Sequence, residues 1–224
     1  MKNIVNLQKK LYQENFLVHG DTPRGTFQNN KITIQERHKH LIENLLPFLP
    51  LKFSLCDLGS GTCDLHAYLL KKGIQHNYTG LEIVPEMRKK AQKKFPYIRI
   101  LGSNILSKSF VEKFDVLVAS GTFNLRKGTN PKVWEKYTLA IINKMFSLAK
   151  VGIAYNALTK YSEFYNDNLH YMSPEKSIFH CQKKLSRFYC LSTIWPLYEF
   201  TMSIIKPKIV RVKYSRNEFV KYLK

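Results

Sequence analysis

One glycine-rich segment, residues 52–70, constrains the fold of this chain more than any other part of the sequence. Its letters, KFSLCDLGSGTCDLHAYLL, give an apolar run that closes on Asp57, then Gly59 and Gly61, and then a helical apolar pattern. Glycine permits sharp turns and lets a ligand approach the backbone closely. A helix that starts at such a turn directs its free N–H groups and its positive dipole end toward the turn. The segment therefore predicts the strand, turn and helix of a nucleotide- or nucleoside-binding α/β fold, and the alternative is a tight connection without a ligand.

The octapeptide DLGSGTCD resembles motif I of the class I S-adenosylmethionine-dependent methyltransferases. Asp57, Gly59 and Gly61 match the acid-x-Gly-x-Gly-x-Gly pattern, and Cys63 replaces the third glycine. The Gly-x-Gly-x-x-Gly spacing of dinucleotide sites fails, because Asp64 stands at the last glycine position. The resemblance therefore implies S-adenosyl-L-methionine as the cofactor.

The resemblance also implies cofactor contacts at the ends of the next strands. Glu82 closes the stretch 76–83 and matches the motif II acid, whose carboxylate accepts hydrogen bonds from ribose hydroxyls. Asn104 stands where these enzymes often carry an aspartate that contacts the adenine amino group, and an amide carbonyl still accepts such a bond. Residues 113–126 supply strand four and the motif IV loop. The expected cofactor-binding residues are Asp57, Gly59, Ser60, Gly61, Glu82, Ile83, Asn104, Ile105, Ser120 and Gly121.

The apolar patterns along the rest of the chain predict helices and strands in alternation. Helices are expected over 2–17, 33–46, 131–150 and 173–185, strands over 76–83, 97–104, 151–159, 188–196 and 198–206, and a short strand or helix over 208–224. The resemblance implies an α/β, Rossmann-like fold with a seven-stranded, mostly parallel sheet, helices on both faces and N-terminal lid helices. We expect one domain over 1–224, with helices and a lid loop at 1–50, a core at 51–224 and an insertion at 160–187.

Three polar residues are candidates for the acceptor side of the site. Asn124 and Asn156 are expected to close strands four and five, at the sheet edge where ligands bind in open α/β folds. His19 lies in the predicted lid and is the first candidate for a general base on an oxygen acceptor. The alternatives are that each amide caps a loop or helix and that His19 is structural. A phosphate or carboxylate acceptor would need no base, because its oxygens are already ionised.

Further segments resemble a small bacterial family of methyltransferases that is associated with surface-polysaccharide and small-molecule modification. These segments are HGDTPRG, ERH, SGTFN, AYNALT and LYEFT. The resemblance implies methyl transfer to an oxygen or nitrogen of a small acceptor that is anionic or carbohydrate-linked.

The net charge of +20 keeps a second hypothesis open. A basic surface attracts nucleic acid, so an RNA methyltransferase is the alternative. The lysines are scattered in pairs, which fits solvated helix faces, and no RNA-binding domain is appended. Motif IV also lacks the Asn/Asp-Pro-Pro-Tyr sequence of enzymes that methylate amino groups of flipped bases. A third hypothesis is an inactive cofactor-binding interaction module, because Cys63 and Asn104 depart from the family pattern.

The remaining sequence features bear on compartment. The four cysteines show no metal-ligand spacing, so we expect free thiols and no metal site. The N-terminus lacks the apolar core of a signal peptide, and no apolar run has the length of a membrane span. We therefore expect a cytoplasmic protein, and the sequence does not indicate its oligomeric state.

Overall fold

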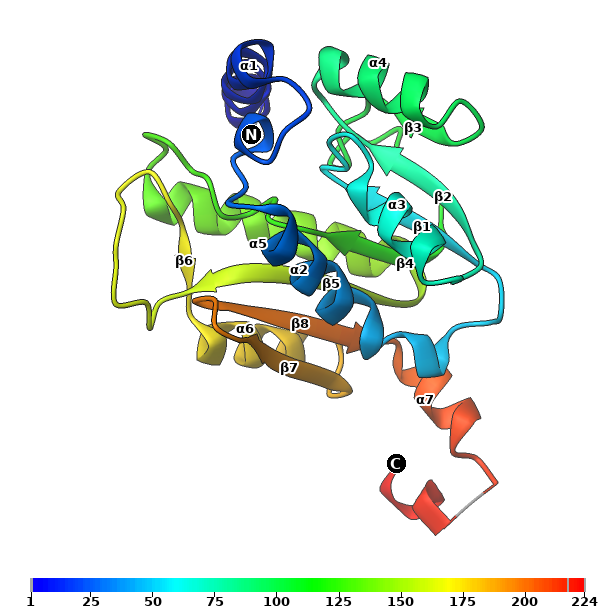
Figure 1. The fold of residues 1–224 in the computed structure, drawn as a ribbon. Coiled ribbons are helices and arrows are strands. Elements are labelled where there is room, and N and C mark those ends of the chain that lie inside the picture. The colour runs from blue at the N-terminus through cyan, green and yellow to red at the C-terminus, as the bar shows by residue number, and fades with distance from the viewer. Residues whose placement is uncertain (1, 217, 224) are drawn as a thin grey trace.

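A central, mostly parallel sheet organises the computed structural model, which describes residues 2–216 and 218–223 (Figure 1). Residues 1, 217 and 224 of the predicted domain lie outside this description. The strands are β1 Phe53–Leu58, β2 His76–Leu81, β3 Arg99–Leu101, β4 Phe114–Ala119, β5 Ala149–Thr159, β6 Tyr171–Met172, β7 Tyr189–Ile194 and β8 Glu199–Ile205. Their order is β3-β2-β1-β4-β5-β8-β7, and the short β6 pairs with β5. β8 is antiparallel to β5 and β7, whereas the other pairings are parallel. The Rossmann-like prediction is confirmed, and the described residues add the two-residue β6 to the seven expected strands.

Helices cover both faces of the sheet (Figure 1). They are α1 Lys2–His19, η1 Arg24–Thr26, α2 Lys31–Glu43, η2 Leu46–Phe48, α3 Asp64–Lys71, α4 Pro85–Lys94, α5 Pro131–Leu148, α6 Pro174–His180, η3 Cys181–Leu185, α7 Pro207–Lys213 and η4 Glu218–Tyr222. α2 begins two residues earlier than expected because Asn30 forms a reciprocal capping box with Thr33. α1 ends at His19, and Gly20 after it has a φ of 61°, the left-handed conformation common after helices. No helix in the described ranges has both the length and the apolarity needed to cross a membrane.

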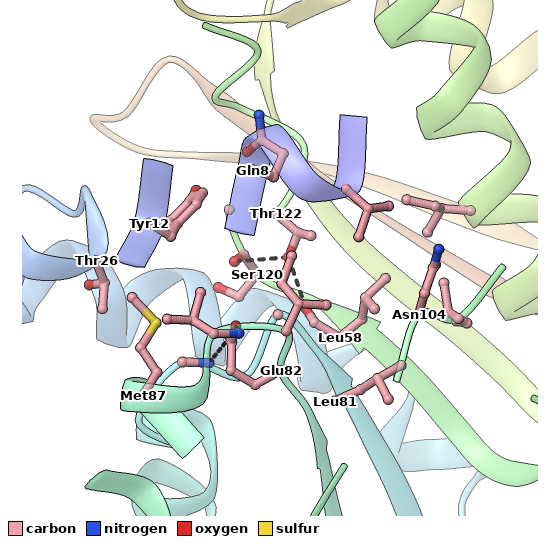
Figure 2. Close-up of a pocket in the computed structure, with 18 of the residues that line it drawn as sticks. Gln8, Tyr12, Thr26, Leu58, Leu81, Glu82, Met87, Asn104, Ser120 and Thr122 are labelled. Carbon is pink, nitrogen blue, oxygen red and sulfur yellow. Dashed lines mark hydrogen bonds between the residues drawn. The ribbon is translucent and has the colours of Figure 1, made fainter. Parts of the chain in front are cut away.

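The carboxyl ends of the central strands meet beneath α1 (Figure 2). Leu58 ends β1, Leu81 ends β2 and Ser120 follows β4, and Figure 2 shows these residues facing Gln8 and Tyr12 of α1 across an open space. This geometry follows from parallel pairing, because β1 aligns with both β2 and β4 in register. The fold therefore places most of the expected cofactor-binding residues around one hollow under the N-terminal helix.

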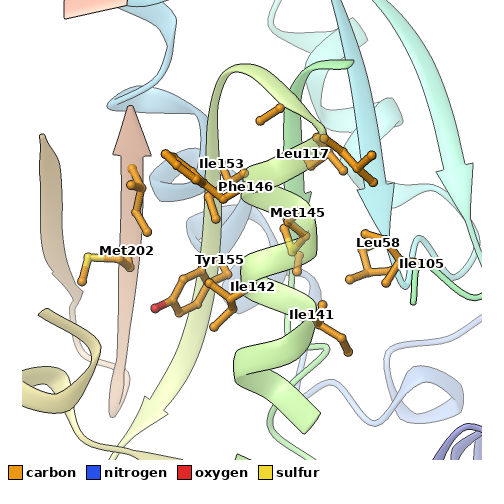
Figure 3. Close-up of a cluster of buried hydrophobic side chains, with 14 of the residues drawn as sticks. Leu58, Ile105, Leu117, Ile141, Ile142, Met145, Phe146, Ile153, Tyr155 and Met202 are labelled. Atoms are coloured by element: carbon orange, nitrogen blue, oxygen red, sulfur yellow. The ribbon is translucent and has the colours of Figure 1, made fainter. Parts of the chain in front are cut away.

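The larger buried cluster lies between the sheet and α5 (Figure 3). Leu117 of β4 and Ile153 of β5 pack with Met145 of α5, and all three are fully buried. Asn130 accepts N–H bonds at the start of α5 and Pro131 fits the first helical turn, so the helix begins at a defined point. Burial of this kind is worth about 25 cal/mol per Å² of apolar surface, so the cluster fixes the strand ends that surround the hollow.

Buried histidines predict a fold that loses stability in acid. Burial lowers the pKa of His38 and of His66 to about 4, against about 6.5 in an unfolded chain. A histidine that must stay neutral in the fold contributes fully above the unfolded pKa, and this contribution is lost as the pH falls toward the folded pKa. For His38 we expect the free energy of unfolding in urea to drop by about 2 kcal/mol between about pH 7.5 and pH 5.

The control for this expectation is the variant His38→Gln, which cannot titrate in this range. Its free energy of unfolding should depend less on pH than that of the wild type. An identical pH dependence in both proteins would show that His38 is not a source of the acid sensitivity.

Candidate functional site

The hollow beneath α1 is a pocket with a mixed polar and apolar wall (Figure 2). The predicted cofactor residues that line it are Gly59, Gly61, Glu82, Ile83, Asn104, Ile105, Ser120 and Gly121. The wall residues that the sequence reasoning missed include Val5, Gln8, Tyr12, Thr26, Gln28, Met87 and Thr122. Val5, Gln8, Tyr12, Thr26 and Gln28 come from α1 and the segment after it, where sequence spacing alone does not show which side chains turn inward.

The glycine turn has the backbone conformation that its sequence predicts. Gly59 and Gly61 have φ values of 71° and 54°, in the left-handed region where side chains are strained. A Cβ on Gly59 would lie 2.9 Å from Oγ1 of Thr122, whereas the nearest atom to a Cβ on Gly61 would be Cγ2 of Thr26, 3.9 Å away. Gly59 is therefore required by the protein's own packing, and Gly61 leaves open space in the pocket wall.

Glu82 is a buried carboxylate held by the turn. Its Oε2 accepts from the Gly61 N–H at 2.9 Å, and its Oε1 accepts from the Val84 N–H at 2.8 Å. Burial raises the pKa of Glu82, and the N–H groups of Val84 and Gly61 oppose that rise by favouring the charged form. Each carboxylate oxygen can accept a second hydrogen bond, so the fixed carboxylate can receive a pair of neighbouring hydroxyls.

Asn104 presents a different group from the one predicted. Its Oδ1 accepts from the Leu106 N–H at 2.9 Å, while Nδ2 has no partner among the described residues. Figure 2 shows the Asn104 side chain at the pocket wall. The free group is thus a donor, which suits a ring nitrogen of a base rather than an exocyclic amino group.

Two predicted cofactor residues, Asp57 and Ser60, do not line the pocket. Oδ2 of Asp57 accepts from the Tyr78 hydroxyl at 2.6 Å, and burial raises the pKa of Asp57 to about 7. Oδ1 of Asp57 and Oγ of Ser60 are buried and lack partners among the described residues. Asp57 is on the strand position next to Leu58, so its side chain points to the opposite face of the sheet from the pocket. Asp57 is therefore bonded to β2 and offers no contact to a ligand in the pocket.

The N-terminal segment covers the pocket and is tied to the core by two side-chain hydrogen bonds. Gln13 of α1 donates to Oε1 of Glu86 at 2.8 Å, which ties α1 to α4. Thr62 donates to Oδ1 of Asp21 at 2.7 Å, which ties the loop after α1 to the glycine turn. His19, the predicted base, ends α1 and lines none of the cavities found among the described residues. The structure therefore places α1 over the pocket but does not bring His19 to it.

A second cavity of about 340 Å³ adjoins the first. The residues that line both are Tyr12, Thr26, Gln28 and Gly121. Asn124 lines the second cavity, although it lies in the loop after β4 and not at the end of the strand as expected. Its Oδ1 accepts from the Leu158 N–H at 3.1 Å, and its Nδ2 has no partner among the described residues. Asn166 and Asn168, from the predicted insertion, form another part of the wall. The arrangement places amide groups beside the first pocket, where a second molecule could be held.

Asn156 does not lie at the end of strand β5, where it was expected. It is inside β5 rather than at its end, and it is fully buried. Its Oδ1 accepts from the Gly121 N–H at 2.7 Å, and its Nδ2 donates to Oε2 of Glu199 at 2.7 Å. Asn156 lines none of the cavities in the described part of the chain, so it supports the motif IV turn from behind.

Glu199 connects Asn156 to the lid. It receives the Arg37 guanidinium, whose Nε lies 2.7 Å from Oε2, and Arg37 also donates to Gln28. Arg37 and Glu199 are 6% and 3% exposed, so this is a buried ion pair. The family-like segments ERH and LYEFT contain Arg37 and Glu199, respectively. Nothing in the sequence indicates that these two residues contact each other.

Comparisons with known proteins agree with this geometry. A family model described as a methyltransferase domain matches residues 55–142. The Mycobacterium tuberculosis protein named "Putative methyltransferase Rv1506c" is 31% identical over 156 residues, which are 69% of this chain and 93% of that protein.

Solved structures share the fold at low sequence identity. The magnesium protoporphyrin IX methyltransferase of Synechocystis, solved with bound SAM, superposes with a TM-score of 0.63 at 13% identity over 90% of this chain and 96% of that chain. An S-adenosylmethionine-dependent methyltransferase of Clostridium acetobutylicum gives a TM-score of 0.56 at 13% identity over 90% of this chain and 98% of that chain.

Proposed function

The chain belongs to the class I S-adenosylmethionine-dependent methyltransferases, and from this premise we propose that the pocket beneath α1 binds the cofactor while the adjoining cavity holds the methyl acceptor. We further propose that residues 1–50 act as the lid of a single domain whose core is 51–224. The observation that carries the proposal is the Glu82 carboxylate fixed by the Gly61 N–H in a pocket that opens into a second, amide-lined cavity.

The residues present fit S-adenosyl-L-methionine. Glu82 has acceptor capacity for the ribose hydroxyls, and the Gly61 backbone leaves space for a close approach. The Asn104 Nδ2 donor and the apolar side chains of Ile83 and Met87 suit the edge and the faces of an adenine ring. When bound, the cofactor supplies a methyl group already activated by its sulfonium centre. The chain's own contribution is to hold both molecules in line and to exclude water by means of α1.

The chemistry of the second cavity favours a small anionic acceptor. Its charged wall residues are the cations Lys127 and Arg37, the latter paired with Glu199. No aspartate, glutamate or histidine lines this cavity within the described ranges. An acceptor whose carboxylate or phosphate oxygen is already ionised therefore suits the wall better than one that must lose a proton. The acceptor is a small carboxylate or phosphate, and a carbohydrate-linked hydroxyl is the second candidate, favoured by the amides of Asn124 and Asn168.

A transfer assay tests this proposal. Purified protein with methyl-labelled S-adenosylmethionine should label members of a panel of small carboxylates and phosphates and should leave a transfer RNA pool unlabelled. Labelling of RNA with no labelling of small molecules would overturn the acceptor class, and labelling of neutral sugars alone would select the carbohydrate alternative.

Glu82→Ala should weaken binding of S-adenosylhomocysteine by about 1.5–3 kcal/mol, because hydrogen bonds to a charged group are lost. Calorimetry with the purified variant measures the change. Glu112→Ala is a matched control, since Glu112 is an exposed carboxylate that pairs with Arg99 and does not line the pocket. Affinity within twofold of wild type for Glu82→Ala would assign the ribose to another residue.

A further inference from the structure

A third, larger cavity lies outside the methyl-transfer site. It is a groove of about 730 Å³ between α5, the segment that contains β6, and α6. Its cationic wall residues are Arg126, Lys132, Lys160, Lys176, Lys183 and Lys184. We call it the basic groove. Within the described ranges Glu135 is the acid that lines it, so the groove collects positive charge beyond the general excess of the chain.

Two of these cations are neutralised by the protein. Lys176 pairs with Glu135 at 3.5 Å, and Lys160 pairs with Glu175 at 3.2 Å. The other four, Arg126, Lys132, Lys183 and Lys184, have no carboxylate partner in the part of the chain that the structure describes. Like charges held in one concavity repel one another and raise the local concentration of anions. The groove therefore has an uncompensated charge that an anion would offset.

Arg126 is held in place before any ligand arrives. Its Nε donates to the Leu169 carbonyl at 3.1 Å, and its Nη1 donates to the Thr129 carbonyl at 2.8 Å. Carbonyl oxygens fix the guanidinium without cancelling its charge, and Nη2 keeps no partner among the described residues. A guanidinium presented in this way matches the oxygens of a phosphate.

A buried hydroxyl in the same groove also lacks a partner. Thr138 of α5 is 1% exposed, and its Oγ1 makes no hydrogen bond to the described residues. That oxygen is closed off from solvent, so Thr138 makes no contact with a ligand, and the groove offers an anion the free donors of Arg126 and of the unpaired lysines.

We propose that the basic groove binds a small molecule that carries phosphate groups, at a site separate from the methyl-transfer pocket. Its volume lies in the range of small-molecule sites. A bridge between Leu125 and Leu169 forms the wall that separates the groove from the acceptor cavity, with Leu125 and Leu169 on one side and Arg126 and Leu169 on the other. The phosphate groups pair with Arg126 and the unpaired lysines. The ligand therefore lies on the other side of this wall from the acceptor cavity.

Calorimetry with pyrophosphate, in the full chain at low and at physiological salt, tests the proposal. Wild type should bind one pyrophosphate, and Lys183→Gln with Lys184→Gln should weaken that binding by about tenfold or more, because charge-assisted hydrogen bonds are lost. Arg126→Gln should do the same, and the lysine variant remains informative if Arg126→Gln disturbs its loop. The affinity for S-adenosylhomocysteine should stay unchanged in every variant.

The matched control removes the same charge elsewhere, in the exposed pair Lys71→Gln with Lys72→Gln at the end of α3. Pyrophosphate binding should be unaffected in this control. Equal weakening of pyrophosphate binding in the control and the groove variants would show that the net charge of the protein, rather than the groove, causes the effect. That result would overturn the site. Absence of saturable pyrophosphate binding would overturn it too, as would displacement of pyrophosphate by a short RNA at physiological salt, which would assign the groove to nucleic acid.

Discussion

Gly61→Val should lower the affinity for S-adenosylhomocysteine by at least about 100-fold, which corresponds to about 2.7 kcal/mol. The Gly61 N–H anchors Glu82, and the space where a side chain would project is open to the pocket, with Cγ2 of Thr26 as the nearest atom at 3.9 Å. The valine methyl groups would therefore occupy the place of the cofactor rather than collide with the protein. Calorimetry with S-adenosylhomocysteine measures the loss directly and does not require the acceptor.

Gly73→Val is the matched control for this variant. Gly73 follows α3 with a φ of 67°, and a Cβ at this position would meet no heavy atom within 4 Å. Both variants carry the cost of a side chain in the left-handed region, about 1–2 kcal/mol, but only Gly61 lines the pocket. Equal loss of binding in the two variants would identify backbone strain as the cause, and wild-type affinity in Gly61→Val would refute the pocket assignment. Gly59 is a poorer test, because its Cβ would contact Thr122.

The cofactor side of the site could be predicted because its information is local in the sequence. A strand, a tight turn and a helix are specified within residues 52–70, and parallel pairing then brings the end of β2 with Glu82 to the same edge. Asp57 was nevertheless placed wrongly. Successive side chains along β1 point to opposite faces of the sheet, so Asp57 faces away from the pocket that Leu58 lines. The acid of the motif instead accepts a hydrogen bond from the Tyr78 hydroxyl of the neighbouring strand β2.

The contacts around Asn156 and the second cavity could not be predicted because they join distant segments. The pairing of β5 with β8 aligns Asn156 with Thr201 and brings Glu199, two residues before it, within reach of the Asn156 amide. The partner of Glu199 is Arg37, which is 162 positions earlier in the chain. From sequence alone, a polar residue in an apolar strand is interpreted as a substrate-binding residue, because its buried partner on another element is not visible in the sequence. Only the assembled sheet shows that Asn156 has such a partner.

Arg37→Met should reduce the free energy of unfolding by about 3–5 kcal/mol, because removing one partner of a buried ion pair leaves the other charge uncompensated. Arg37 contacts Glu199 through Nε and Nη2 and reaches Gln28 through Nη1. The variant therefore leaves Glu199 buried, with the Asn156 amide as its one remaining side-chain donor among the described residues. Urea unfolding followed by circular dichroism measures the change.

The double variant Arg37→Met with Glu199→Gln separates the loss of charge balance from the loss of packing. Its buried glutamine is neutral and can still accept from Asn156, so the protein should recover a large part of the stability that Arg37→Met loses. Asn156 would then keep its contact with the Gly121 N–H, and affinity for S-adenosylhomocysteine should return with the stability, since Gly121 lines the cofactor pocket. Additive losses in the double variant would show that the pair is not energetically coupled. Recovery of stability without recovery of affinity would show that the guanidinium itself, rather than the support of the Gly121 turn, matters for the pocket.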